Sequence, residues 1–318
     1  MIPFGLVYVP YTMNTTTLEV LTTIGHAAQY RHVPKDITPH VTQKSIEYPG
    51  SMHTFCWTHS LKTHNQDAVG SGDNYIAVAD GITPLTSGDK EATATSRFST
   101  DLMYGLAEHG LVAPDTLRAG LTLAIHYAQK RRELDEVSST LTVATWDDRD
   151  FRIATMGDCI ALVLTTSGWR VVCDPSYADH DERYLAQVYA RVEQGATWQD
   201  AYSELTPELI QDRRARNTDH GTGIVSGSVD PAEVAGHFHE VTLPREQVKA
   251  CILLSDGADN WRSLFNLVDE PGLLAASGKD LLEYWEEAVK LQTADAERSS
   301  YPRLSDLDDS SLARVDFR

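Results

Sequence analysis

Two separate apolar segments of the chain end in the same Asp-Gly pair. Residues 76–79 read Ile-Ala-Val-Ala and precede Asp80 and Gly81, and residues 252–255 read Ile-Leu-Leu-Ser and precede Asp256 and Gly257. Carboxylates at the ends of rigid strands are well placed to hold Mg²⁺ or Mn²⁺, because these hard cations prefer oxygen ligands. A following glycine lets the backbone approach a ligand closely. The pattern indicates a metal site built from distant parts of the chain.

Further aspartates recur in similar positions: Asp67 in Asn65-Gln66-Asp67, Asp158 in Met156-Gly157-Asp158, and the pair Asp308-Asp309 before the last apolar run. Each one alone is also typical of a turn, because Asp-Gly favours type I′ hairpins and Gly-Asp favours type II′. A carboxylate at the end of a buried strand, however, carries a desolvation cost that a cation offsets. Both interpretations stay open for each residue, and their joint occurrence favours the metal site.

The elements that must position these residues follow from the hydrophobic pattern. Residues 75–79 are apolar throughout and predict a buried strand, and apolar residues then recur every four positions in two successive helices. The first begins near Asp89, with Ala94, Phe98, Leu102 and Leu106 on one face; the second is opened by Pro114 and carries Leu117, Leu121, Ile125 and Ala128. Four short strands separated by brief turns follow, which predicts a meander of antiparallel hairpins at residues 140–146, 151–156, 159–165 and 169–173.

The second half of the chain predicts a polar helical insertion at about 180–212 and a return to strands. Those strands are expected at 222–226, 238–243 and 250–255, followed by a helix with Leu281, Trp285 and Ala288 and a last strand at 312–317. No internal repeat or long linker is present in the sequence. We therefore expect one large α+β domain with a helical insertion.

Composition excludes several classes of partner. The 318 residues include 27 basic and 46 acidic side chains, a net charge of −19, so the chain lacks the positive field that nucleic acid or anionic lipid requires. No apolar run approaches the roughly 18 residues that cross a bilayer, and the N-terminus lacks the pattern of a secretory signal. The four cysteines show no Cys-x-x-Cys spacing. We expect a cytoplasmic monomer that binds neither nucleic acid nor membrane.

Six short motifs, in order, resemble the metal-dependent protein phosphatases of the type 2C (PPM) family, particularly its bacterial members, over about residues 53–317. They are Asn65-Gln66-Asp67-Ala68, Val78-Ala79-Asp80-Gly81, Ser139-Thr140-Leu141-Thr142-Val143-Ala144, Met156-Gly157-Asp158-Cys159, Leu253-Leu254-Ser255-Asp256-Gly257 and Asp308-Asp309-Ser310-Ser311-Leu312. The resemblance implies a four-layer α/β/β/α sandwich of two antiparallel sheets flanked by helices. On this basis we predict an N-terminal extension at 1–50 and a phosphatase domain at 51–318, with a flap-like helical insertion at about 180–220.

The resemblance also implies a set of metal ligands. Asp80 would bridge two Mn²⁺ or Mg²⁺ ions, and Gly81 would lend its carbonyl to one of them. Asp256 and Asp308 would complete the ligands of the first metal, and Asp158 would take part in a third, more loosely held ion. Asp67 would either lie behind the ligands and contact them or hold a metal-bound water. Asp308 is preferred to Asp309 because the family places its ligand four residues before the first core residue of the last strand.

Three positions depart from the family pattern. Gln66 stands where most members have Glu, and Lys62 stands where many have a phosphate-binding Arg; Lys provides a point charge without the bidentate fork of Arg. Ile82-Thr83-Pro84 replaces the His-Gly-Gly of many eukaryotic members, so a histidine general acid is missing there. His64 is a candidate substitute, although a packed or exposed loop histidine is the commoner case.

The implied activity is hydrolysis of phosphoserine or phosphothreonine in a phosphoprotein, by a hydroxide bridging the two ions. Asp80, Asp256 and Lys62 are the expected catalytic residues, with Lys62 holding the phosphate. A basic cluster of Arg213, Arg214 and Arg216 is a candidate substrate-binding surface, or simply a solvated face. Two alternatives remain: a weakly active or inactive regulatory module with the same fold, and a metal-free sugar hydrolase using two carboxylates.

Overall fold

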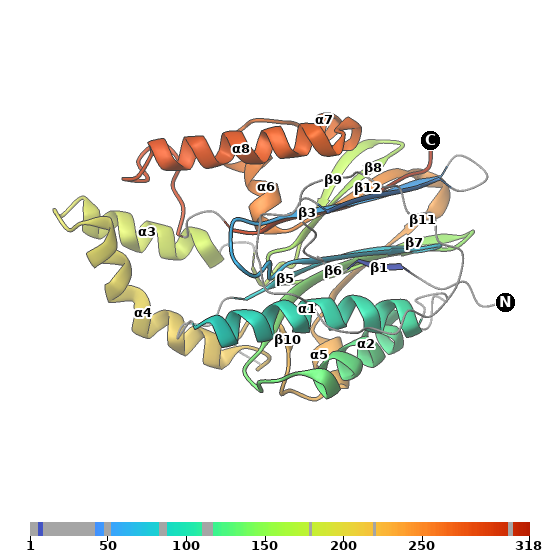
Figure 1. Ribbon diagram of the computed structural model, residues 1–318, viewed down its shortest axis with the longest axis horizontal. Helices are drawn as coiled ribbons and strands as arrows, with labels where there is room; N and C mark the ends of the chain where they lie inside the picture. The colour runs from blue at the N-terminus through green and yellow to red at the C-terminus, as the bar shows by residue number, and fades with distance from the viewer. Residues whose placement is uncertain are drawn as a thin grey trace.

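Two antiparallel sheets pack face to face in the computed structural model, which describes residues 6–8, 42–47, 52–82, 88–109, 117–177, 180–218, 221–304 and 308–318 (Figure 1). The order of the first sheet is β1 (Leu6–Tyr8), β4 (Ala68–Gly72), β5 (Tyr75–Gly81), β6 (Ser138–Trp146), β7 (Asp150–Met156) and β11 (His239–Pro244), with β10 (Val225–Ser226) also paired to β6. The order of the second is β2 (Thr42–Glu47), β3 (His53–His59), β13 (Ser310–Asp316), β12 (Val248–Leu254), β8 (Ile160–Thr165) and β9 (Gly168–Val172).

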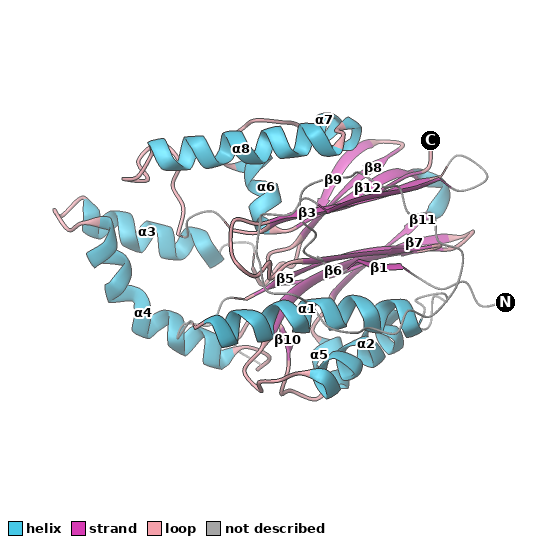
Figure 2. Ribbon diagram, in the orientation of Figure 1, coloured by secondary structure: helices cyan, strands magenta, loops and turns pink. Residues whose placement is uncertain are grey.

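Helices cover the outer face of each sheet (Figure 2). The first sheet packs against α1 (Asp89–His109), α2 (Leu117–Arg131) and α5 (Pro231–Gly236). The second packs against α6 (Asp256–Ser263), α7 (Glu270–Ala275) and α8 (Gly278–Ala294). This arrangement confirms the predicted α+β class and its four α/β/β/α layers. Within the described ranges, no helix combines the length and the apolar character that crossing a membrane requires.

Strands at the centre of this sandwich are apolar on both faces because both faces are covered. In β5, Ile76 and Val78 pack between the sheets, while Ala77 and Ala79 pack against the helices of the first sheet. The same alternation places Cys251 and Leu253 of β12 between the sheets. Side chains on a strand point to opposite faces in turn, so Asp80 shares the inner face with Ile76 and Val78. The predicted helix faces of α1, α2 and α8 are confirmed as buried.

The meander predicted for residues 140–173 is wrong at its middle connection. β6 pairs with β7, and β8 pairs with β9, but β7 and β8 belong to different sheets. The chain therefore crosses from one sheet to the other at Gly157-Asp158, where Gly157 has a φ of 87° that favours glycine. Strands buried on both faces lack a polar side, so their pattern does not identify the sheet they join.

Smaller differences concern element bounds. The strand predicted at 222–226 is reduced to Val225–Ser226, and the short helices α5, α6 and α7 were not predicted. Pro114, expected to open the second helix, lies outside the described residues, as do Thr83 and Pro84. Two strands from the first fifty residues, β1 and β2, pair with β4 and β3. A 3₁₀ turn, η2 (Arg245–Gln247), connects β11 to β12.

The predicted helical insertion forms a pair, α3 (His180–Val192) and α4 (Trp198–Ala215), which we call the flap helices. Tyr184, Val188, Ala201 and Leu205 form a small apolar core of their own between them. The pair lies to one side of the sandwich (Figure 1). The loop that follows α8 contacts this pair.

Arg298, in the loop after α8, attaches the flap helices to the main domain. Its guanidinium lies 3.6 Å from the centre of the Trp198 ring, and its carbonyl accepts a hydrogen bond from the Tyr189 hydroxyl. The loop itself is held by Asp295, which accepts from the backbone N–H groups of residues 299, 300 and 301 and pairs with Arg303 at 3.2 Å. A desolvated cation–π contact fixes the position of one helix pair against this loop.

We expect Trp198→Ala to loosen the flap helices without unfolding the sandwich. Loss of the ring removes its contact with Arg298 and its stacking on Tyr202, together worth about 1–3 kcal/mol. Hydrogen exchange measured by mass spectrometry should accelerate in α3 and α4 and stay unchanged in β5 and β12. Leu123→Ala on the exposed face of α2 is the control. Equal acceleration across both sheets would contradict this assignment.

Candidate metal centre

Aspartates from both sheets meet at one edge of the sandwich. Asp80 ends β5 and Asp67 precedes β4, both in the first sheet, whereas Asp256 follows β12 in the second. Asp158 lies at the crossing between the sheets, and Asp308 precedes β13. Asp80 pairs with Thr140 inside the ladder, and Asp256 opens helix α6. Neither Asp-Gly pair forms a hairpin turn, so the turn interpretation fails for both.

These carboxylates interact through space. Burial is the main cause that raises the pKa of Asp80, and the neighbouring charges of Asp67, Asp256, Asp308 and Asp158 raise it further. Burial likewise raises the pKa of Asp256, with Asp308 and Asp158 the next causes. Like charges held in a low-dielectric site destabilise one another. The structure therefore gathers all five predicted aspartates into one electrostatic cluster.

Several oxygens of the cluster have no partner in the described part of the chain. Asp67 is 1% exposed, and neither carboxylate oxygen accepts a hydrogen bond; the nearby Ser311 hydroxyl donates to Thr58 instead, at 2.7 Å. Oδ1 of Asp256 is also enclosed and unbonded. Buried acceptors left without donors are costly. A hard divalent cation satisfies such oxygens, so the donor set fits Mn²⁺ or Mg²⁺.

A thiol lies beside the same cluster. Ligand atoms of Asp80, Asp158 and Cys159 all lie within 4.8 Å of one another. The Cys159 sulfur contacts the Thr140 hydroxyl at 3.1 Å, and burial, followed by the charge of Asp158, raises the pKa of the thiol. A thiol kept protonated is a poor ligand for a hard cation. The oxygens of the aspartates are therefore the relevant donors.

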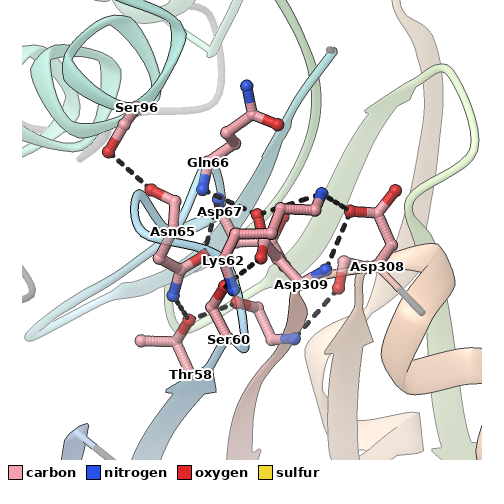
Figure 3. A network of polar contacts seen from close by, with 11 residues as sticks. Thr58, Ser60, Lys62, Asn65, Gln66, Asp67, Ser96, Asp308 and Asp309 are labelled. Carbon is pink, nitrogen blue, oxygen red and sulfur yellow. Dashed lines mark hydrogen bonds and ion pairs between the residues drawn. The ribbon is translucent and has the colours of Figure 1, made fainter. Parts of the chain in front are cut away.

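Lys62 reaches into the site from the loop after β3, and Figure 3 shows its ammonium between two carboxylates. It forms an ion pair with Asp308 and lies 3.6 Å from Oδ2 of Asp309. Burial acts to lower the pKa of Lys62, but Asp308 and Asp309 outweigh it, and the pKa is raised. The lysine stays charged and partly neutralises the cluster.

Asp308 and Asp309 differ in their surroundings. The Asp309 side chain is 1% exposed and accepts hydrogen bonds from the Ser60 hydroxyl and, at 2.7 Å, from the backbone N–H of Gln66 (Figure 3). The Asp308 side chain is 29% exposed, and its Oδ1 accepts from the Lys62 ammonium and, at 2.8 Å, from the backbone N–H of Asp309. Asp309 therefore ties the Lys62 loop to β13, and Asp308 stays the predicted ligand.

Two glycines are required by packing at the site. A Cβ on Gly81 would lie 2.6 Å from the carbonyl oxygen of Gln66, to which the Gly81 N–H donates at 3.1 Å. A Cβ on Gly257 would lie 2.2 Å from the carbonyl oxygen of Asp309. No larger residue fits without moving the backbone. The glycine after each aspartate thus lets two chain segments approach across the site.

The other predicted residues lie around the cluster with different roles. Gln66 contributes its backbone, as donor to Asp309 and acceptor from Gly81. The His64 ring contacts the Thr93 hydroxyl of α1 at 3.1 Å, which identifies it as a packed loop histidine. Arg213 and Arg214 lie on α4, outside the residues that line the cavity next to the aspartates. Their role in substrate binding stays a prediction.

Two polar residues that support the site, Ser60 and Asp174, were not predicted, and a third, Asp309, was named only as part of the Asp308-Asp309 pair. Ser60 and Asp309 fix the Lys62 loop, and Asp174 accepts from the Gly157 N–H at 3.1 Å and from Ser176. Asp174 thereby holds the turn that carries Asp158. Of the three, only Asp309 could have been identified from the sequence, because it adjoins the predicted ligand Asp308. A single Ser or Asp in a loop forms no recognisable pattern.

We expect Gly257→Ala to disturb the site through its backbone. The added Cβ would displace Asp309 or the start of α6, at a cost of about 1–3 kcal/mol in the free energy of unfolding. Gly236→Ala, at the end of α5, meets no atom within 4 Å and should change stability by less than about 0.5 kcal/mol. Urea denaturation of both variants measures the difference. Equal stability of the two would show that the site tolerates the extra atom.

One family model matches most of the chain. A family model described as protein phosphatase 2C matches residues 59–297, which include Lys62 and both Asp-Gly pairs and end before Asp308. No curated protein is significantly similar in sequence.

Solved structures of phosphatases resemble the chain in fold. The catalytic domain of the serine/threonine phosphatase PstP, in complex with 2 manganese ions, is 15% identical, with 87% of this chain and 97% of that chain covered and a TM-score of 0.47. Stp1 from Staphylococcus aureus is 16% identical, with 92% and 100% covered and a TM-score of 0.44. MsPP from Mycobacterium smegmatis, in complex with cacodylate, is 16% identical, with 84% and 98% covered and a TM-score of 0.45.

Proposed function

Because the chain belongs to the protein phosphatase 2C family, we propose that it hydrolyses phosphoserine or phosphothreonine in protein substrates with the help of Mn²⁺ or Mg²⁺. The observation that carries the proposal is the convergence of buried, incompletely satisfied carboxylates from both sheets. A bound cation would offset the repulsion between these carboxylates, which makes their close approach favourable. In this proposal the protein acts as a monomer on phosphoproteins in the cytoplasm.

Asp80, Asp256 and Asp308 would hold the first two cations, with the Gly81 carbonyl as a further oxygen. Asp158 would take part in a third ion, and Asp67 would orient a water. When bound, the cations supply Lewis acidity at the phosphoryl group and promote deprotonation of a water nucleophile. No side chain is needed as a nucleophile, which agrees with the lack of a nucleophile motif in the sequence.

The remaining chemistry belongs to Lys62. Its ammonium is paired with Asp308 and lies near Asp309. Were Asp308 to hold a cation, Lys62 would keep Asp309 as its anchor and would have donors available for a phosphate oxygen. A lysine gives one point contact where arginine gives two, so phosphate is held with less directional precision. Asp309, enclosed by Ser60 and the Gln66 N–H, keeps the ammonium at the mouth of the site.

An inactive or weakly active regulatory module is the second candidate, and Gln66, Ile82 and the Lys62–Asp308 ion pair favour it. The two candidates differ in one measurable outcome. Calorimetry with Mn²⁺, combined with hydrolysis of p-nitrophenyl phosphate and a phosphoserine peptide, separates them. Tight Mn²⁺ binding without turnover of either substrate would favour the module. Full activity in EDTA would instead favour a metal-free hydrolase.

We expect Asp80→Asn to abolish most activity while the fold is kept. Removal of a carboxylate charge that would hold the cations should cost several kcal/mol of stabilisation, which corresponds to at least about a 100-fold fall in kcat. Circular dichroism checks the fold, and Asp101→Asn on α1, outside the cluster, is the control. Retention of more than a tenth of wild-type kcat in Asp80→Asn would count against the proposal.

Asp256→Asn should have opposite effects on stability without and with metal. The pKa of Asp256 is raised in the folded chain, so the folded chain binds more protons than the unfolded one, and the metal-free protein loses stability as pH rises. In EDTA at alkaline pH the variant should be more stable than wild type, by about 1 kcal/mol. With saturating Mn²⁺ the order should reverse. Thermal unfolding in both buffers measures this, and an unchanged order refutes it.

Lys62→Met should weaken phosphate binding more than turnover. The variant keeps most of the side-chain volume and removes the charge, so KM for a phosphopeptide should rise about tenfold or more. Lys62→Arg, which keeps the charge, is the matched control and should retain a KM near that of wild type. Steady-state kinetics at saturating Mn²⁺ gives both constants. A kcat defect with unchanged KM would remove Lys62 from the phosphate site.

A further inference from the structure

A cavity of about 490 Å³ adjoins the carboxylate cluster. Asp158, Asp256 and Asp308 are among its lining residues, and further lining comes from β8, β9, the segment at 173–177, α3, α6 with the two residues after it, α8 and the loop at 302–304. Its size falls in the range of specific ligand sites, about 300–1,000 Å³. The cavity is therefore continuous with the proposed catalytic centre and bounded on one side by the flap helix α3.

Much of the cavity wall is apolar. Ile160 and Val171 line it from the second sheet, Leu185 from α3, and Phe265 and Leu304 from the segments after α6 and α8. Val171 is 54% exposed, which is unusual here for a large apolar side chain. Apolar walls of this kind suit the methylene stem of a long side chain whose polar end reaches further.

Two acceptor groups of the cavity wall, Gln292 and Glu182, are relevant to a ligand. Oε1 of Gln292 is enclosed and accepts no hydrogen bond in the described part of the chain, and the residue is 8% exposed. Glu182, an exposed carboxylate on α3, lines the cavity as well. The Gln292 amide oxygen can accept a hydrogen bond from a ligand, and the Glu182 carboxylate binds a positively charged donor most strongly.

The arginines that line the cavity are already paired. Arg262 lies 2.8 Å from Asp259 and 3.4 Å from Glu270, and Arg303 lies 3.2 Å from Asp295. Their charges are thus met by carboxylates of the protein itself. The carboxylates that engage these arginines are Asp259, Glu270 and Asp295, not Glu182.

We propose that this cavity binds a lysine or arginine side chain of the phosphoprotein substrate, close in sequence to the phosphorylated residue, and that Glu182 selects for it. The proposal rests on the proposed function for the neighbouring phosphate site. Apolar walls contact the stem, while Gln292 and Glu182 accept from its charged end. A basic residue beside the phosphate also offsets the repulsion between a phosphate dianion and a chain of net charge −19.

Two phosphoserine peptides test the proposal, identical except that arginines flank the phosphoserine in one and glutamates in the other. Their Kd values are measured by fluorescence anisotropy with wild type in EDTA, where no metal-dependent turnover occurs, and kcat/KM is measured with Mn²⁺. We expect the arginine peptide to bind at least about tenfold more tightly. Added salt should reduce the difference, because part of the selection is electrostatic.

Glu182→Lys should reduce the ratio of the two Kd values at least about fivefold. The matched control is Glu193→Lys, which makes the same change in net charge at an exposed position just after α3, outside the cavity lining. It should alter the ratio by less than twofold. Gln292→Met, which removes the enclosed acceptor at similar volume, should lower the ratio independently of Glu182. Because each ratio compares two peptides on one variant, a general loss of folded protein cancels.

Equal Kd values for the two peptides on wild type would overturn the proposal, as would equal effects of Glu182→Lys and Glu193→Lys, which would indicate the field of the whole protein. Preference for the arginine peptide in EDTA, with no turnover of either peptide in Mn²⁺, would support the cavity assignment and refute the proposed phosphatase function. Turnover without preference would do the reverse.

Discussion

Repulsion among buried carboxylates is the constraint on which the architecture depends. Asp80 and Asp67 come from one sheet and Asp256 from the other, and burial makes each of their charges costly. Lys62 brings one positive charge to this group and is held beside Asp308 and Asp309. A flexible chain would relax by separating the aspartates. Here they are kept together because the strands that carry them are fixed by apolar packing on both faces.

That packing is divided into separate layers with different tasks. The layer between the sheets, with Ile76, Phe151 and Leu253, sets the arrangement of the aspartate-bearing strand ends. The outer layers under α1 and α8 keep each sheet rigid. The flap helices have a fourth, smaller core and join the domain chiefly through the Arg298 loop. The strand ends that carry the aspartates thus adjoin the large apolar layers, whereas α3 beside the cavity rests on the small core of the flap helices.

The sequence predicted the elements whose patterns are local and strong. The four-residue repeat of Phe98 and Leu102 identified α1, and the apolar run before Asp80 identified β5, because burial on one or both faces leaves a direct trace in residue type. The crossing at Gly157-Asp158 could not be predicted, since Ile153 and Val163 both face the layer between the sheets and neither shows which sheet it belongs to. Ser60 and Asp174 were missed because their roles depend on partners far away in the sequence. The order of the motifs predicted the candidate site, whereas the residues that hold its loops in place, Ser60 and Asp174, were identified only from the structure.

The layer between the sheets has a further consequence. Asp80 and Asp256 stand at the ends of strands on opposite sides of this layer. The thickness of the layer therefore sets the distance between the two aspartates. Replacement of one apolar side chain in this layer by a larger or a smaller one would change the spacing of the Asp80 and Asp256 carboxylate oxygens, although the replaced residue does not contact them. A change in that spacing would alter whether the proposed site favours a larger or a smaller cation, although no residue proposed to hold the cation would change.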